Sequence, residues 1–454
     1  MYRQYDSVDV IVIGSGFAGL AAAIVAAQAG CSVRVLEKRD FCGGNSWISG
    51  GALAAVDSAM QDRYGIADST KLMFEDMMRA GRCNNPELVQ LVCEHSYDVL
   101  QWLRKDFGVK FMPRLEQLGG HSVPRCHNIE DIQGRNIINP MLEMARDLGV
   151  QIHMESVMEA LIQCDDGAVI GVELRNPEGA QQLFAQQSVI LASGGFSDEA
   201  AGANALRTSL NDSTSEILHI AEQAGAELVD MEHLQMLPCA SPDEEGRGVA
   251  PVFASYVIFP YGLMINPETG QRFVNEWTDR KTRADKMLAL SACPIGITDQ
   301  QALDIVGDMI YDHMDEKVTR RFDSLEALAA FHQLPYDVLK ETVTTYNDYV
   351  ARGCDDDFAK PIPVKAKPLK APFYSVRLWP KAHSTMGGVR INAQAQVMTP
   401  LGNPIPRLYA AGEVTGGVHG MSRLGCCAIT ECLVFGRIAG EQSSVLNPTA
   451  ETIS

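Results

Sequence analysis

A glycine-rich turn close to the N-terminus brings together the first residues whose spacing could do chemistry. Residues 8–40, "VDVIVIGSGFAGLAAAIVAAQAGCSVRVLEKRD", have the pattern of a strand, a glycine turn, a helix and a second strand. Gly14 would make the tight turn, Gly16 would let the backbone approach a pyrophosphate, and Gly19 would let the helix pack closely on the strand. Glu37 ends the second strand, where a carboxylate can bind ribose hydroxyls. The pattern predicts a dinucleotide site.

Three further segments indicate which dinucleotide this is. The glycines of "FCGGNSWISGG", with Asn45 and Ser46, give a backbone that can lie against an extended dinucleotide and the edge of a ring system. A buried strand in "SVILASGGFS" ends at Gly194, and another in "PRLYAAGEVTGG" is followed by Glu413, which can reach a ribityl chain. Because both ends of the chain contribute to one dinucleotide, and only one fingerprint is present, we predict FAD.

A charged stretch later in the chain offers residues for acid–base chemistry. "FVNEWTDRKTRAD", residues 273–285, is typical of a solvated helix face, but Arg280 within it could also act on a substrate. His383 in "HSTMGG" and Arg423 in "SRLG" are basic residues beside glycine-rich turns. In isolation the first would be read as a core histidine and the second as a salt-bridge partner.

Four motifs occur together in an order that identifies a family. "GGNSWISGG", "RFVNEWTDR", "HSTMGGV" and "AGEVTGGVHGMSRLG" stand at spacings like those of the soluble fumarate reductase flavoproteins. That family includes flavocytochrome c and urocanate reductase and is related to the succinate dehydrogenase flavoproteins. The chain resembles it over about residues 7–442.

The resemblance implies an α/β fold in which a Rossmann-like FAD-binding domain is built from two chain segments. We expect these segments at 1–232 and 375–454, with an inserted α+β capping domain at 233–374. Within the insertion, the apolar spacing of residues 324–353 predicts a helix, a turn and a second helix.

The resemblance also implies roles for the basic residues. His383 and Arg423 fall on carboxylate-binding positions, where charge-assisted hydrogen bonds hold an anion, and Arg280 falls on the proton donor. An arginine is a weak acid, with a pKa above about 12. The carbanion formed beside a carboxylate is very basic, so a weak acid in contact with it can still give up a proton. Lys281 and Arg283 are then solvated or pocket charges.

The FAD is expected to be bound non-covalently, since Asn45 and Ser46 stand in the segment where membrane-bound relatives carry a flavin-linking histidine. Glu216 falls near the cofactor but would equally suit a helix-capping acid. The expected cofactor residues are Gly14, Gly16, Ala18, Gly19, Glu37, Asn45, Ser46, Gly50, Gly51, Gly194, Glu216, Ser384, Glu413, Ala428 and Ile429. The expected substrate residues are Gly51, Leu237, Arg280, His383, Arg423 and Cys426. Further candidates are His121, Arg125, His127 and His419.

Three departures from the family pattern bear on the substrate. Leu237, in "QMLPCAS", replaces a histidine that grips the second carboxylate of fumarate. The segment that should carry a proton-relaying glutamate and arginine reads "FASYVIFPYG", so Glu276, Asp279 or water would have to relay the proton. Cys426, in "RLGCCA", adds bulk beside the carboxylate site where the family has glycine.

We therefore expect an apolar wall that rejects a second charge, because burying an unpaired carboxylate costs several kcal/mol. Its expected members are Leu237, Met236, Val257, Phe259 and Tyr261. Such a wall predicts a monocarboxylate 2-enoate or aryl acrylate as the substrate, rather than fumarate.

Three alternatives stay open. A small dicarboxylate would fit if Arg125 or Arg283 replaced the lost histidine. A flavin dehydrogenase acting oxidatively on a ketosteroid-like substrate would share the fold. A flavin-binding protein without turnover would lack a proton relay, as this chain does.

Composition limits the partners. The formal net charge of −19 argues against a general surface for nucleic acid or anionic membrane. The 12 cysteines show no metal-ligand spacing, so we expect no metal, and scattered unpaired cysteines suit a reducing compartment. With no apolar run near about 18 residues and no evident signal peptide, we expect a cytoplasmic protein without a membrane span. The electrons would come from a separate donor protein or a reduced flavin.

Overall fold

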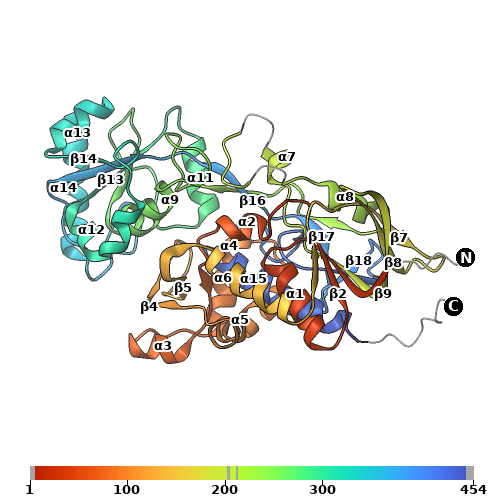
Figure 1. The fold of residues 1–454 in the computed structure, drawn as a ribbon. Coiled ribbons are helices and arrows are strands. Elements are labelled where there is room, and N and C mark those ends of the chain that lie inside the picture. The colour runs from red at the N-terminus through yellow and green to blue at the C-terminus, as the bar shows by residue number, and fades with distance from the viewer. Residues whose placement is uncertain (1–5, 202–204, 211–212, 446–454) are drawn as a thin grey trace, which may run out of the picture.

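A mostly parallel sheet forms the centre of the larger part of the molecule (Figure 1). The computed structural model describes residues 6–201, 205–210 and 213–445. The parallel core of the sheet runs, in spatial order, through β19 (Pro404–Ala410), β9 (Gly179–Leu191), β1 (Ser7–Ile13), β2 (Val33–Leu36) and β6 (Gln151–His153). β18 (Gln396–Met398), β8 (Val169–Asn176) and β7 (Val157–Gln163) extend it by antiparallel pairing.

Two helices from opposite ends of the chain pack together on this sheet. They are α1 (Phe17–Gln28) and α15 (Cys427–Ser443). The close approach requires glycine, since a Cβ on Gly436 would lie 2.6 Å from the carbonyl oxygen of Ala18, and one on Gly440 would lie 2.5 Å from that of Ala22. This contact joins the two segments of the FAD-binding part.

Smaller elements complete that part. The helices are α2 (Gly44–Ile48), α3 (Ser58–Arg63), α4 (Thr70–Gly81), α5 (Pro86–Asp106), α6 (Arg135–Asp147), α7 (Ser197–Ala201) and α8 (Glu216–Gln223). The strands are β3 (Leu53–Ala54), β4 (Phe111–Glu116), β5 (Cys126–Ile129), β10 (Leu228–Val229), β17 (Gly388–Arg390) and β20 (Thr415–Gly416).

A second part of the molecule, at the upper left of Figure 1, is built around a four-stranded antiparallel sheet. Its strands are, in spatial order, β12 (Leu263–Ile265), β13 (Ile295–Asp299), β15 (Phe373–Arg377) and β14 (Arg320–Phe322). Its helices are α9 (Ala250–Phe253), α10 (Phe259–Tyr261), α11 (Arg280–Leu288), α12 (Gln300–Val306), α13 (Leu325–His332) and α14 (Tyr336–Arg352). A turn of π-helix (Ala254–Ile258) joins α9 to α10.

The expected helix, turn and helix over 324–353 are present as α13 and α14. Strand β15 pairs inside the capping sheet, so this sheet extends past residue 374. The division of the chain at residues 232 and 374 stays a prediction.

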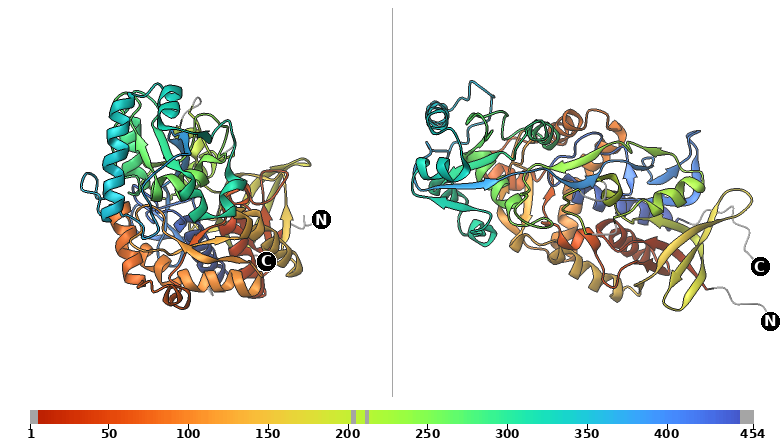
Figure 2. Two further views of the ribbon diagram at one scale, coloured as in Figure 1. Left: turned by 90° about the vertical axis from the view of Figure 1, so that its left-hand side faces the viewer. Right: turned by 90° about the horizontal axis from the view of Figure 1, so that it is seen from above.

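Two antiparallel strands connect the parts, as the right-hand view of Figure 2 shows in green and blue. β11 (Leu234–Leu237) carries the chain into the capping part and β16 (Lys381–Thr385) returns it, with Leu234 opposite Thr385 and Leu237 opposite Lys381. The pairing places Leu237 and His383 on one short ribbon between the two parts.

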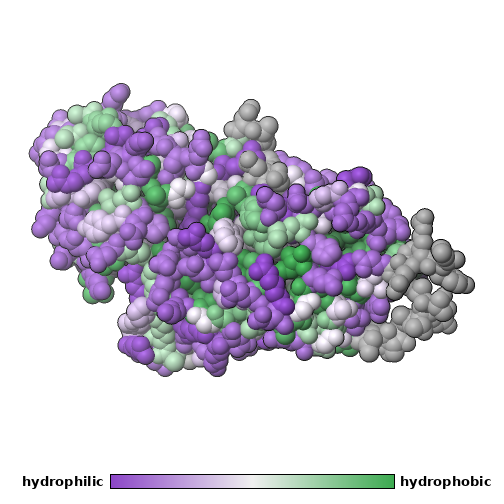
Figure 3. All heavy atoms as spheres, viewed as in Figure 1, coloured by the Kyte–Doolittle hydropathy of each residue, from purple (hydrophilic) through white to green (hydrophobic). Residues whose placement is uncertain are grey.

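Polar residues cover most of the face seen in Figure 3, and apolar residues gather near the middle of the molecule. Across the described ranges, no helix combines the length and the apolar character needed to cross a membrane.

Candidate active site

A groove at the carboxyl ends of β1 and β2 has the shape that a pyrophosphate requires. Gly14 has a φ of +104°, and a Cβ there would lie 2.4 Å from the carbonyl oxygen of Ala192. A Cβ on Gly19 would lie 2.0 Å from the carbonyl oxygen of Gly14, so glycine is required for the helix to sit this close. Gly16 has no side chain to cap the 12-residue helix α1, which leaves the positive N-terminal end of that helix facing the groove.

The far end of this groove carries the acid expected to bind ribose. Glu37 is buried and accepts hydrogen bonds from the backbone N–H of Ser15 (3.2 Å) and of Arg39 (3.0 Å). Glu216 lines the same groove with its carboxylate 3.8 Å from Lys38 Nζ. The structure therefore brings both predicted acids to the lining of one groove.

The groove continues into an inner cavity. The two share the lining residues Phe17, Asn45, Ser46, Glu413 and Cys432. Ser46 Oγ accepts a 3.1 Å hydrogen bond from the backbone N–H of Phe17, and Asn45 Oδ1 accepts one of 2.8 Å from Leu210. An extended dinucleotide with a ring system at one end fits this continuous shape.

Nearly all of the predicted site residues line this continuous space. Gly19 alone among them lies beside it and serves the packing of α1. The groove takes Gly14, Gly16, Ala18, Glu37, Asn45, Ser46, Gly194, Glu216 and Glu413. The inner cavity takes Gly50, Gly51, Leu237, Arg280, His383, Ser384, Arg423, Cys426, Ala428 and Ile429.

Arg280 and Arg423 are brought together by the residues that precede them. Asp279 caps α11 by accepting a 3.0 Å hydrogen bond from the backbone N–H of Thr282, which fixes Arg280 as the first helical residue. The Ser422 hydroxyl donates a 3.2 Å hydrogen bond to the same Asp279 carboxylate. One carboxylate therefore sets the start of the Arg280 helix and the loop that carries Arg423.

Both guanidinium groups have unused donors. Arg423 is 5% exposed, and its Nε has no partner among the residues described. Burial, and next the charge of Arg280, lower its pKa to about 10. Arg280 Nη1 is likewise buried and without a partner in the described ranges. Buried donors of this kind are costly to leave unpaired, so the pair is suited to an anion.

His383 lies on β16 and lines the same cavity as these arginines. Its Nδ1 lies 2.7 Å from Thr208 Oγ1, which leaves Nε2 as the ring nitrogen available to a ligand. Burial, and then the charges of Arg423, Arg280 and Arg247, hold its pKa well below the usual 6.5. The ring is therefore neutral at neutral pH, and a bound anion would make its protonation easier.

Arg247 is a third guanidinium in the cavity, and no pattern in the sequence indicated it. It contributes to the lining opposite Gly50, where an ideal Cβ would lie 2.9 Å from Arg247 Nη2. Within the described part of the chain, no hydrogen bond or ion pair reaches its guanidinium. Burial lowers its pKa, and Arg280 acts in the same direction. Arg247 lies in the acidic, glycine-containing run "SPDEEGRGVAP", which has no periodicity to mark it.

The prediction of an apolar wall is wrong for four of its five residues. Leu237 lines the cavity, while Met236, Val257, Phe259 and Tyr261 do not. The segment that holds three of them folds as short helices around a π-helical turn, and this geometry turns Val252, Ser255 and Tyr256 toward the cavity instead. The wall is therefore mixed, with Ser255, Tyr256 and Arg247 among apolar groups. The Tyr256 hydroxyl donates a 2.9 Å hydrogen bond to Asn128 Oδ1.

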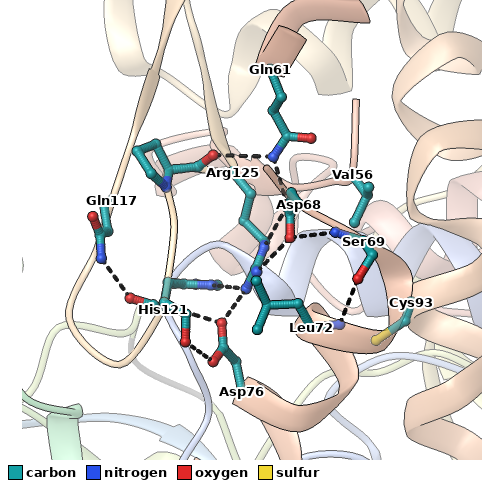
Figure 4. Close-up of polar contacts among 12 residues, drawn as sticks. Val56, Gln61, Asp68, Ser69, Leu72, Asp76, Cys93, Gln117, His121 and Arg125 are labelled. Atoms are coloured by element: carbon teal, nitrogen blue, oxygen red, sulfur yellow. Dashed lines mark hydrogen bonds and ion pairs between the residues drawn. The ribbon is translucent and has the colours of Figure 1, made fainter. Parts of the chain in front are cut away.

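Arg125 is committed to a structural network (Figure 4). It is fully buried and forms ion pairs with Asp68 (2.8 Å) and Asp76 (2.6 Å). It also lies 3.1 Å from His121 Nδ1, and His121 Nε2 lies 2.9 Å from the carbonyl oxygen of Gly425. Burial, and then the Arg125 charge, lower the pKa of His121 to about 4, so it is neutral and donates through Nε2. Through the hydrogen bond to Gly425, the network holds the loop that precedes Cys426.

Other ionisable candidates lie outside the cavity lining. Arg283 donates a 2.9 Å hydrogen bond to the carbonyl oxygen of Glu276 and stacks on Phe259 at 4.0 Å. Glu276 is held by Arg272 at 2.7 Å and by Lys360 at 3.6 Å. His127 is buried and His419 is partly buried, and burial lowers their pKa values to about 4 and about 3.

Cys426 occupies a conformation that side chains rarely adopt. Its φ is +68°, in the left-handed region, which costs about 1–2 kcal/mol for a residue with a Cβ. It is the N-cap residue of α15 and lines the inner cavity. A strained non-glycine residue beside a ligand cavity is a reason to look for a role for its side chain.

Comparisons with known proteins agree with this geometry. The family model described as "FAD binding domain" matches residues 9–429. The acrylate reductase flavoprotein subunit of Shewanella woodyi (strain ATCC 51908 / MS32) is 40% identical, over 95% of this chain and 90% of that protein. The urocanate reductase of Eggerthella lenta is 33% identical, over 97% of this chain and 75% of that protein.

Among solved structures, the open conformation of a flavocytochrome c3 fumarate reductase superimposes with a TM-score of 0.74. The two are 32% identical, and the match covers 97% of this chain and 78% of that one. The expected fold, an FAD-binding domain with a capping domain, is confirmed. The chain belongs to the FAD-binding domain family and is an FAD-dependent oxidoreductase of the fumarate reductase flavoprotein type.

Proposed function

We propose that this protein reduces a carbon–carbon double bond conjugated to a carboxylate. The observation that carries the proposal is that Arg280, His383 and Arg423 line one cavity, and that this cavity continues into the dinucleotide groove. The names of the relatives, acrylate reductase and urocanate reductase, point to the same class of reaction.

The residues divide the chemistry between them. Arg423 and His383 hold the substrate carboxylate, which takes up charge as the double bond is reduced. FAD, when bound, supplies the hydride for the β-carbon. Arg280 then gives a proton to the α-carbon, because the developing carbanion is far more basic than a guanidine. Its unpaired Nη1 is free to reach that carbon.

We propose a monocarboxylate 2-enoate or an aryl acrylate as the substrate. Leu237 supports this, because it lines the cavity and offers no partner to a second carboxylate. The acrylate reductase relative points to a small substrate with one carboxylate.

A second candidate substrate, a small dicarboxylate such as fumarate, is favoured by Arg247. This guanidinium is placed to pair with a second carboxylate, as neither Arg125 nor Arg283 is. The proton route back to Arg280 would then pass through water or through Ser255 and Tyr256, because Glu276 is held in its own ion-pair cluster.

We also propose that FAD is bound without a covalent link and that a separate protein or a reduced flavin supplies its electrons. Asn45 and Ser46 line the groove, and neither is a histidine that could form a covalent bond to the flavin. A relative named as a flavoprotein subunit is consistent with a separate electron-donating component.

The test is to reduce the bound flavin chemically without oxygen and to mix it with acrylate, cinnamate, urocanate and fumarate, following reoxidation by absorbance. Fast reoxidation by an enoate supports the function, and the ranking of acrylate and cinnamate against fumarate decides between the two substrate classes. If no compound in the panel reoxidises the flavin faster than buffer does, the proposal fails. Weight then moves to an oxidative dehydrogenase or to flavin binding without turnover.

A further inference from the structure

We propose that Cys426 is a modification site for the enoates that this cavity binds, its sulfur adding to their β-carbon to form a thioether. The inference rests on the proposed function, because it requires the carboxylate of a 2-enoate to be held by Arg423. It goes beyond that function in assigning a second, covalent fate to the same substrate.

Cys426 is one of the residues that line the ligand cavity. It stands three residues after Arg423, and both side chains contribute to one lining together with Arg280 and His383. Its left-handed backbone turns the chain into α15 at this point, directly beside the cavity.

Two positive features lie beside Cys426. It is the N-cap residue of the 17-residue helix α15, whose N-terminal end carries a partial positive charge. The positive charge of Arg423 lies close enough that the two groups interact electrostatically.

A second, independent observation points to the ligand. Arg423 is 5% exposed, its Nε has no partner among the residues described, and Arg280 Nη1 is in the same condition. An anion inside the cavity would give these buried donors a hydrogen-bond partner. A 2-enoate held there by its carboxylate has its double bond within the same small space as the sulfur, which raises the effective concentration of one beside the other.

The step balances without an added oxidant or reductant. The Cys426 thiol loses its proton to solvent, and the thiolate forms a carbon–sulfur bond to the β-carbon. The π electrons of the double bond move to the α-carbon, which takes a proton from Arg280, and solvent returns a proton to Arg280. The net change is the addition of S–H across the double bond.

The cations that prepare the substrate for reduction also prepare it for this addition. A free carboxylate makes an enoate a poor electrophile, because its negative charge opposes the attack of a nucleophile. Arg423 offsets that charge and the neutral His383 ring can add a hydrogen bond, so the β-carbon becomes a better acceptor for any nucleophile in the cavity. Reduction and thioether formation therefore compete for the β-carbon. The fraction of enoate that forms the thioether should rise when no electrons are supplied to the flavin.

The experiment uses the FAD-loaded protein with its flavin oxidised. It is incubated with acrylate, and the intact mass and the peptide map are followed over time. We expect a single addition of one acrylic acid per chain, located on Cys426, with a rate that saturates as acrylate is raised. Propionate, which has the carboxylate and lacks the double bond, should slow the addition by occupying the cavity.

Two variants serve as matched tests. Cys426→Gly suits the left-handed backbone and should abolish the saturable addition. Cys354→Ser removes an exposed cysteine outside the cavity and should leave that addition unchanged. Prior reduction of the flavin should lower the yield of adduct in the native protein.

The outcomes separate the two proposals. If acrylate reoxidises the reduced flavin but no adduct forms on Cys426, this inference fails and the proposed function stands. Addition at Cys126 or Cys427, or addition that neither saturates nor responds to propionate, also overturns it. If the adduct forms while no enoate reoxidises the flavin, the reductase proposal fails and the cavity is only a carboxylate site with a reactive thiol.

Discussion

The hydroxyl of Ser422 donates a 3.2 Å hydrogen bond to the carboxylate of Asp279, and these two residues immediately precede Arg423 and Arg280. The bond joins the C-terminal part of the FAD-binding segment to a helix of the capping part. Because Asp279 also caps that helix, one side chain contacts both of the segments that carry the two arginines.

Exchanging Asp279 distinguishes a positioning residue from a proton relay. Asp279→Asn keeps an oxygen that can accept from Thr282 and Ser422, so we expect turnover within a few-fold of the native protein. Asp279→Ala removes the cap and the tie, which should lower stability by about 1 kcal/mol and raise KM for the enoate. Thermal unfolding and steady-state assays measure both effects. A loss of turnover in Asp279→Asn equal to that in Asp279→Ala would mean that the carboxylate itself moves protons.

Arg280→Ala should abolish proton donation while leaving the dinucleotide groove intact. We expect kcat to fall by about 100- to 10,000-fold, the usual contribution of a general acid. FAD content, measured by absorbance after gel filtration, should not change. Lys281→Ala is the matched control, because Lys281 pairs with Asp285 at 3.0 Å on the surface side of the same helix. Retained turnover in Arg280→Ala would assign the acid elsewhere.

Arg247→Met should reveal what the third guanidinium binds. If a second carboxylate pairs with Arg247, the ratio of kcat/KM for fumarate to that for acrylate should fall at least about tenfold, the equivalent of 1.4 kcal/mol. An unchanged ratio would show that Arg247 makes no contact with a second carboxylate. Flavin reoxidation with both compounds gives the ratio directly, and Arg377→Met, an exposed arginine paired with Asp243, is a suitable control.

His121 should make the protein sensitive to acid. Its pKa in the folded protein is about 4, below the ordinary 6.5, chiefly because it is buried. The unfolded chain therefore takes up this proton first as the pH falls. The stabilisation is complete above pH 6.5 and is lost as the pH approaches 4, by an amount of about 3 kcal/mol.

The measurement is urea unfolding at several pH values for the native protein and for His121→Gln. The glutamine can still donate to the carbonyl of Gly425 but does not titrate, so the difference between the two curves isolates His121 from the other buried histidines. Parallel curves from pH 7 to pH 4 would contradict the prediction.

The sequence predicts best where chemistry and backbone geometry coincide. Gly14 and Gly19 are required by contacts of 2.4 and 2.0 Å that any side chain would violate, so their spacing alone indicates the turn and the packed helix. The helices of 324–353 follow from regular apolar spacing.

The sequence could not predict the role of Arg247 or the residues of the cavity wall, for a different reason. Which side chains of 254–261 face the cavity depends on a π-helical turn, and such a turn changes the direction of the residues in and after it without leaving a mark in the residue pattern. Arg247 projects from an irregular loop, where position follows from tertiary contacts rather than from period.

The pairing of β11 with β16 means that the capping part could be exchanged as one unit. The chain leaves and re-enters the flavin half at neighbouring points, Leu234 opposite Thr385 and Leu237 opposite Lys381, so two crossovers in these strands would exchange the whole insertion between relatives. Such an exchange would carry Arg247 and Arg280 to the new host and leave His383 and Arg423 behind. Recombination within this strand pair would therefore change two arginines of the cavity in one event and keep the dinucleotide groove together with the proposed carboxylate contacts.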